Sequence, residues 1–131
     1  MLKDSNKLGY WPFLIWSITI AILMLLPSDS FPESKLLSYD KLAHVGVFAI
    51  HAILLLSGMT WKGKSKTRNT YFFALTICIV YGSLLEYLQT YIPGRMTDLN
   101  DFIANCTGGL VGVIIFSIFT RQKFVINKLK L

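Results

Sequence analysis

Nine polar side chains with the chemistry for catalysis or binding lie at or just inside the ends of apolar segments. They are Asp40, Lys41, His44, Glu86, Gln89, Arg95, Asp98, Asp101 and Asn105. A charge in the hydrocarbon of a bilayer costs at least a few kcal/mol, so such residues usually face a protein interior and mark a function. A histidine beside carboxylates is suited to general acid–base catalysis. We therefore take His44, Glu86 and Asp40 as the candidate catalytic residues.

The other six side chains are candidates for substrate binding. Arg95 and Lys41 could hold a phosphate or carboxylate group, the arginine through two parallel hydrogen bonds. The remaining four are Gln89, Asp98, Asp101 and Asn105. A divalent metal on Asp40, His44, Glu86 and Asp98 is an alternative, but the chain has no spaced ligand motif such as HExxH. We therefore expect no metal and no cofactor.

Several polar residues also have a simpler explanation. Asp98 and Asp101 stand where a helix begins, and acids are favoured there by capping and by the helix dipole. Lys41 and Arg95 could lie at the level of the lipid headgroups. Glu86 is harder to explain in this way, because it lies inside an apolar segment and needs a partner.

Two histidine-based alternatives carry less weight. His51 is expected to be a packed residue rather than a ligand. A hydrolase built on Ser83 and His44 is disfavoured, because no G-x-S-x-G motif surrounds the serine and such hydroxyls usually bond to their own helix backbone.

The composition is that of a membrane protein. Of the 131 residues, 53% are hydrophobic and 15% charged, and the mean hydropathy is +0.54, as expected for a chain with membrane-spanning segments. Four apolar segments, at about 9–26, 42–61, 70–92 and 102–120, approach the roughly 20 residues that span a bilayer as a helix. We expect one all-α domain over residues 1–131, a polytopic membrane protein with four transmembrane helices.

The basic residues predict the orientation. Ten of them fall at the two ends of the chain and in the loop after the second segment, against three in the other two loops. The positive-inside rule then places both termini in the cytoplasm. A cleaved signal peptide on Lys3 and Lys7 is disfavoured, because no small-residue site follows Leu26. The net charge of +6 reflects this grouping, and we expect no nucleic-acid partner.

This topology brings the nine polar residues to the outer side of the membrane. Six of the seven acidic residues fall there. Helical spacing places Asp40 with His44, Glu86 with Gln89, and Asp98, Asp101 and Asn105 on single stripes of their helices. Gly108-x-x-x-Gly112 permits a close helix approach. We therefore expect one polar pocket facing the extracytoplasmic side.

The cysteines carry little information, because Cys78 and Cys106 give no disulfide spacing pattern.

At these residues the chain resembles the VanZ-like family of small bacterial membrane proteins. The matching segments are Asp40-Lys41-x-x-His44-x-x-x-Phe48, Glu86-x-x-Gln89, Pro93-Gly94-Arg95, Asp98-x-x-Asp101-x-x-x-Asn105 and Gly108-Gly109-x-x-Gly112. The resemblance implies a multi-pass protein of the bacterial cytoplasmic membrane and a link to low-level resistance to the glycopeptide teicoplanin. It does not imply a particular reaction.

Two functions of different classes follow. In the first, the pocket binds or modifies a cell-envelope molecule, a lipid-linked phosphate or a glycan, whose acyl chains lie against the helices. In the second, the protein is a non-catalytic membrane factor or partner subunit of an envelope enzyme, and the polar cluster is purely structural. A third function, transport, has less support. The polar residues lie at one end of the spans only and form no path across the bilayer, unless the chain forms a homo-oligomer. Whether any reaction is catalysed stays open.

Overall fold

The computed structural model describes residues 8–27, 40–61 and 66–129, and all of its regular structure is helical. A short 3₁₀ turn, η2 (Leu8–Tyr10), leads into α1 (Trp11–Leu25). The other helices are α2 (Asp40–Met59), α3 (Arg68–Gln89) and α4 (Leu99–Leu129). All four are long and apolar enough to cross a membrane, the spans being Leu8–Leu25, Asp40–Met59, Arg68–Gln89 and Leu99–Gln122. The expected all-α fold with four membrane helices is confirmed.

Local sequence explains where these helices begin and end. The hydroxyl of Thr67 accepts from the Thr70 amide and completes a reciprocal capping box, so α3 starts two residues before its apolar segment. Before α4, the Asp98 carboxylate accepts from the Asn100 amide at 2.8 Å, as an N-terminal cap does. The helix ends therefore include polar residues that hydropathy alone excludes from the spans.

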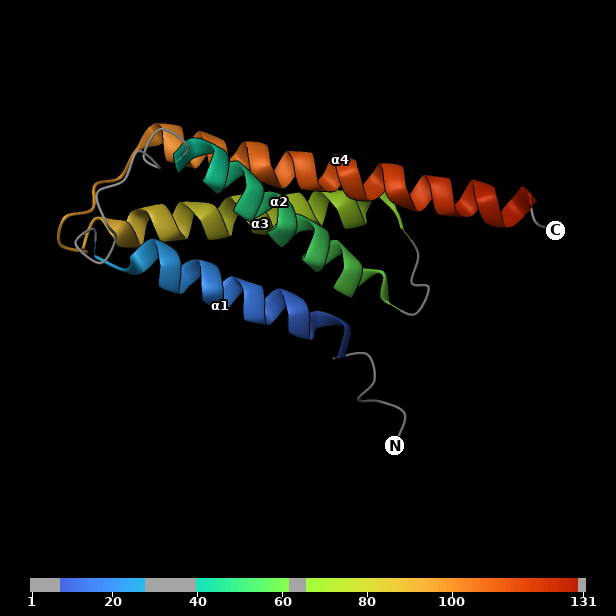
Figure 1. Ribbon diagram of the computed structural model, residues 1–131, viewed down its shortest axis with the longest axis horizontal. Coiled ribbons are helices and arrows are strands. Elements are labelled where there is room, and N and C mark those ends of the chain that lie inside the picture. Colours follow the sequence, from blue (N-terminus) through green and yellow to red (C-terminus); the bar gives the residue numbers. More distant parts are fainter. Residues whose placement is uncertain (1–7, 28–39, 62–65, 130–131) are drawn as a thin grey trace.

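A close contact between α2 and α4 organises the bundle (Figure 1). A Cβ atom added to Gly108 would press against the backbone carbonyl of Val45, and one added to Gly112 against that of Ala49. Only glycine allows the two backbones to approach so closely. The expected role of Gly108 and Gly112 in helix packing is confirmed.

Helix α1 packs against α2 and α3 through interhelical hydrogen bonds. Trp16 Nε1 donates to the Val47 carbonyl at 3.1 Å, and Tyr81 Oη donates to the Ser17 carbonyl at 2.5 Å. An apolar cluster of Ile20, Met24, Phe48 and Leu85 fills the space between these helices. Large apolar side chains such as Phe72 and Val80 stay exposed on the outside of the bundle, as contact with lipid requires.

His51 belongs to this packing. It is fully buried, its ring stacks on Tyr81 with centroids 4.9 Å apart, and it also contacts Phe13. Its expected role as a packed residue is confirmed. Ser83 Oγ donates to the Ile79 carbonyl one turn back, so the backbone-bonding alternative for that serine is also confirmed. Cys78 and Cys106 are both free thiols.

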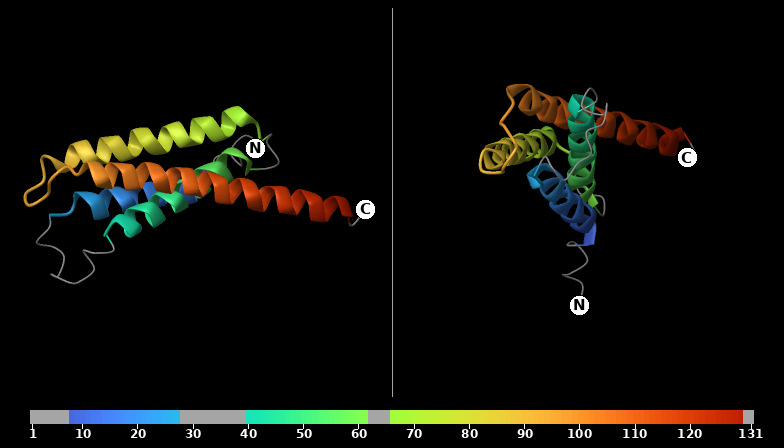
Figure 2. Two further views of the ribbon diagram at one scale, coloured as in Figure 1. Left: turned by 90° about the horizontal axis from the view of Figure 1, so that it is seen from above. Right: turned by 60° about the vertical axis from the view of Figure 1, so that its left-hand side comes forward.

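The ends of the helices that carry the nine polar residues all lie at one end of the bundle. Figures 1 and 2 show the end of α1, the start of α2, the end of α3 and the start of α4 together, with the opposite helix ends, near the N and C labels, at the other side. Several basic residues that predict the orientation, Lys3, Lys7, Lys35, Lys62, Lys64 and Lys130, lie outside the described residues. The cytoplasmic placement of the termini therefore stays a prediction.

Candidate functional site

Seven of the nine predicted residues lie together at this end of three helices and form two groups of contacts, which we together call the polar network. Its members are Asp40, Lys41 and His44 on α2, Glu86 on α3, Asp98 before α4, and Asp101 and Asn105 on α4. The three members on α2 precede Glu86 by 42 to 46 positions. They lie close to the α4 members because α2 and α4 pack closely at glycine residues.

The buried part of the polar network centres on Asn105. Its Oδ1 lies 2.8 Å from His44 Nδ1, and its Nδ2 donates to Glu86 Oε1 at 3.2 Å. Asn105 is 1% exposed and Glu86 3% exposed. The amide of Asn105 therefore joins a histidine of α2 to a carboxylate of α3.

Glu86 is only partly satisfied by these contacts. Its backbone carbonyl accepts a long hydrogen bond from Thr97 Oγ1, at 3.4 Å, but its side-chain atom Oε2 is buried without a hydrogen-bond partner among the described residues. A buried carboxylate oxygen that lacks a partner is costly, and in a folded protein it calls for an explanation such as a function or a bound molecule. The partner that Glu86 needs as a residue inside an apolar segment is Asn105, whose short amide fits between the packed helices.

The outer part of the polar network is charged and more exposed. Lys41 Nζ forms an ion pair with Asp98 Oδ2 at 2.6 Å and another with Asp101 Oδ1. The hydrogen bond from Lys41 holds the pKa of the Asp98 carboxyl below its usual value. His44 Nε2 lies 3.8 Å from Asp40 Oδ1, one turn away on the same helix. Lys41 is thus an ion-paired residue that joins the start of α2 to the start of α4.

Gln89 and Arg95 hold the end of α1. Gln89 is 4% exposed, and its Nε2 donates to the Met24 carbonyl at 2.9 Å. Arg95 Nε donates to the Leu26 carbonyl at 3.1 Å. Arg95 follows Gly94, whose φ of 74° turns the chain back toward α1 and suits a residue without a side chain. Both side chains satisfy carbonyls that a helix end leaves unpaired.

Sequence reasoning missed three contributors to this end of the bundle. Thr97 contacts the carbonyl of Glu86, and the carbonyls of Met24 and Leu26 fix Gln89 and Arg95. Every residue has a backbone carbonyl, so the sequence cannot show which carbonyls act as acceptors. A single threonine in a loop likewise has no distinguishing pattern.

These observations define a class: an integral membrane protein of four helices with a partly buried acid–amide–histidine network at one end. The chain belongs to the VanZ/LLP1 family. The model of this family matches residues 13–120, which is most of the chain. The expected family is confirmed. No curated protein and no solved structure matches the chain.

Proposed function

We propose that the end of the bundle carrying the polar network faces the outside of the bacterial cytoplasmic membrane and binds or modifies a cell-envelope molecule. The observation that carries this proposal is Glu86, a buried carboxylate whose Oε2 has no hydrogen-bond partner among the described residues. Such an oxygen is an open acceptor for a hydroxyl or amide of a ligand.

A graded exposure supports access to this carboxylate. The Asp40 side chain is 43% exposed and that of His44 13%, whereas Asn105 and Glu86 are almost fully buried. The contacts among these four residues therefore run from the end of the bundle into its interior. In this proposal His44 and Asp40 meet the ligand at the exposed side, and Asn105 holds the imidazole ring in position.

The composition of the polar network favours a ligand that brings hydrogen-bond donors. Four carboxylates, on Asp40, Glu86, Asp98 and Asp101, accompany the single ammonium of Lys41. Carboxylates accept hydrogen bonds from sugar hydroxyls, and a phosphate on the same molecule would require the cations Lys41 and Arg95. A lipid-linked glycan phosphate combines both groups and places its acyl chains against the apolar helix surfaces.

The test is purification in native lipid with mass spectrometry of the lipids that co-purify. We expect a defined glycolipid or isoprenoid phosphate with the wild-type chain and with Ser83→Ala, whose exposed hydroxyl contacts only its own helix. We expect its loss in Glu86→Gln and His44→Gln at unchanged protein level. Recovery of bulk phospholipid alone from the wild type would contradict the proposal. In the same variants we expect the loss of any protection against teicoplanin, measured as growth of a susceptible bacterium that expresses the chain.

A specific observation favours the second candidate, a non-catalytic membrane factor. Gln89 and Arg95 were predicted to bind substrate, yet both bond backbone carbonyls of the α1 end, which is a structural role. If the whole polar network has such a role, its variants lose folded protein rather than activity. Thermal unfolding of Glu86→Gln separates the two candidates, because a folded and inactive protein supports only the first.

A further inference from the structure

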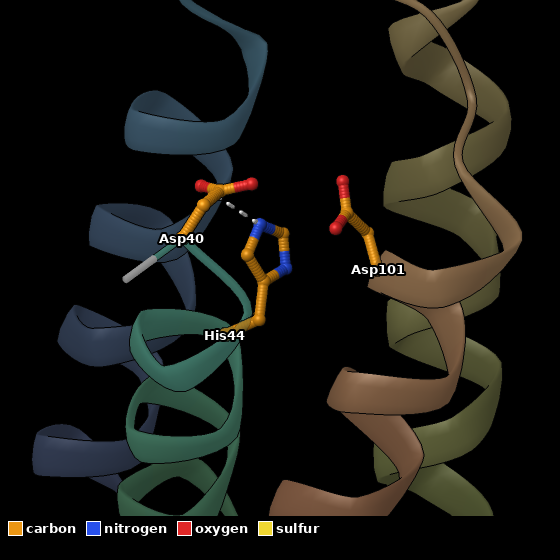
Figure 3. Close-up of side chains that lie close together, drawn as sticks. All are labelled: Asp40, His44 and Asp101. Atoms are coloured by element: carbon orange, nitrogen blue, oxygen red, sulfur yellow. Dashed lines mark ion pairs between the residues drawn. The ribbon is translucent and has the colours of Figure 1, made fainter. Parts of the chain in front are cut away.

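Three potential metal ligands converge at the outer edge of the polar network. Asp40 and His44 on α2 and Asp101 on α4 each offer one ligand atom, and these atoms all lie within 4.8 Å of one another. In Figure 3 the imidazole stands between the two carboxylates, with the Asp101 oxygens directed across the gap between the helices toward it. This is the only such group of three among the residues that the structure describes.

The hydrogen bonds behind His44 set which of its nitrogens is available. Asn105 Nδ2 donates to Glu86 Oε1 at 3.2 Å, so the other side of the amide faces His44. Asn105 therefore presents Oδ1 to His44 Nδ1, 2.8 Å away, and that nitrogen must carry the proton. The lone pair of the neutral ring then lies on Nε2, the nitrogen that lies 3.8 Å from Asp40 Oδ1.

This arrangement is the one that metal-binding histidines use. A ligating histidine donates its other N–H to an oxygen that orients the ring, and that oxygen is itself held by further hydrogen bonds. Here Asn105 supplies the oxygen and Glu86 holds Asn105. Glu86 Oε1 thereby fixes which side of the Asn105 amide faces the imidazole.

The distances fit a transition-metal ion after a small adjustment. Zinc binds carboxylate oxygen and imidazole nitrogen at about 2.0–2.2 Å, so neighbouring ligand atoms of a tetrahedral site lie about 3.4 Å apart. His44 Nε2 and Asp40 Oδ1 are already close to this spacing, and the wider separations close by rotation of the two aspartates. Three protein ligands leave a fourth position open, as in zinc sites that bind a further molecule.

The ion pairs of Lys41 show that a positive charge is already bound beside these ligands. Its ammonium pairs with Asp101 and, at 2.6 Å, with Asp98. Asp98 provides an alternative partner when Asp101 turns toward a metal, so the lysine keeps an ion pair after the change. Lys41 and a metal ion therefore compete for Asp101 while Asp98 stabilises either arrangement.

The geometry points to a divalent transition-metal site, of the kind that Zn²⁺ fits, formed by His44 Nε2 and the carboxylates of Asp40 and Asp101. Asn105 and Glu86 orient the histidine without touching the ion. The sequence leads to the expectation of no metal and offers a metal on Asp40, His44, Glu86 and Asp98 only as an alternative. The proposed site keeps Asp40 and His44 and takes Asp101 as its third ligand. The inference does not depend on the envelope ligand proposed above, since the probe is the metal alone.

The test is direct metal binding to the full-length chain, purified in detergent, stripped with chelator and titrated with Zn²⁺ by calorimetry. We expect one equivalent to bind, and about 100-fold weaker binding in Asp40→Asn, His44→Gln and Asp101→Asn, because each removes a ligand. The matched comparison is Asp98→Asn, an aspartate that also contacts Lys41 but lies outside the ligand group. It should weaken binding by about tenfold at most, through the loss of charge alone, and clearly less than the ligand variants. Lys41→Met should bind about tenfold more tightly, because the competing positive charge is gone.

Two outcomes overturn the inference. One is the absence of a stoichiometric site in the wild type. The other is an equal loss in Asp98→Asn and Asp101→Asn, which indicates diffuse attraction of cations to acidic side chains. Should His44→Gln fail to fold, Asp40→Asn decides, because that side chain is exposed and its replacement leaves the buried contacts in place. Replacement of Zn²⁺ by Co²⁺ adds an absorption spectrum that reports nitrogen and oxygen ligands in a wild-type sample and disappears in the ligand variants.

Discussion

His44 and Asn105 meet across the contact between α2 and α4, with Nδ1 of the histidine 2.8 Å from Oδ1 of the amide. The two residues are 61 positions apart in the chain. Their contact exists because Gly108, one turn after Asn105, lets α4 lie directly against the α2 backbone at Val45. The packing of two helices thus sets the position and the tautomer of the histidine on which both proposals depend.

Asn105→Ala should destabilise the protein by about 2–4 kcal/mol, because it leaves the buried Glu86 carboxylate and the His44 N–H without their partner. The measurement is unfolding in mixed micelles followed by circular dichroism. Thr107→Ala is the matched control on the same helix. That hydroxyl is exposed and bonds only the Ile103 carbonyl, so a change within about 0.5 kcal/mol is expected. Equal stability of the two variants would show that the amide bridge is not formed.

Glu86→Gln should fold with a stability within about 1 kcal/mol of the wild type, because the amide oxygen can still accept from Asn105 Nδ2 while an incompletely paired buried charge is removed. Its ligand binding should be lost. Thermal unfolding and lipid analysis on one preparation check both expectations. A variant that binds the same lipid as the wild type would remove Glu86 from the site.

Gly108→Ala should cost about 1–3 kcal/mol and separate α2 from α4, because the added methyl group has no room beside the Val45 carbonyl and the Phe48 Cβ. Gly46→Ala is the matched control, since a methyl group there meets no atom within 4 Å. Alanine at position 46 should be neutral or stabilising by up to about 1 kcal/mol, because it favours the helix. Chemical unfolding of the two variants side by side measures the difference, and a Gly108→Ala protein as stable as Gly46→Ala would contradict the observed packing.

Asp98 should titrate below an ordinary aspartate, because the Lys41 ammonium stabilises its charged form. A lowered folded pKa contributes stability that is present above the unfolded value and is lost as the pH falls through the folded value. The ion pair should therefore be intact from neutral pH down to about 4, near the unfolded value of an aspartate. Carbon-13 NMR of labelled aspartates follows the titration. In Lys41→Met the pKa of Asp98 should rise toward that of a free aspartate, and an unchanged titration would show that the pair is absent in solution.

The sequence by itself determined the number of membrane helices, the membership in a family of small membrane proteins and the end of the bundle at which the polar residues meet. Hydropathy and helical spacing are local properties, and both are readable without a fold. The predicted spans agree with the observed helices to within three residues except at the end of α4, which continues to Leu129. The earlier starts of α3 and α4 follow the capping residues Thr67 and Asp98.

Only the tertiary structure decided how the nine polar residues divide. It assigned Gln89 and Arg95 to the end of α1, and it placed Asn105 between His44 and Glu86. It also brought Asp101 beside Asp40 and His44, although a helix and two connections separate them in the chain. The partners of a side chain depend on how each helix is rotated about its axis and on how closely it packs against its neighbour. A spacing pattern within one helix gives neither of these quantities.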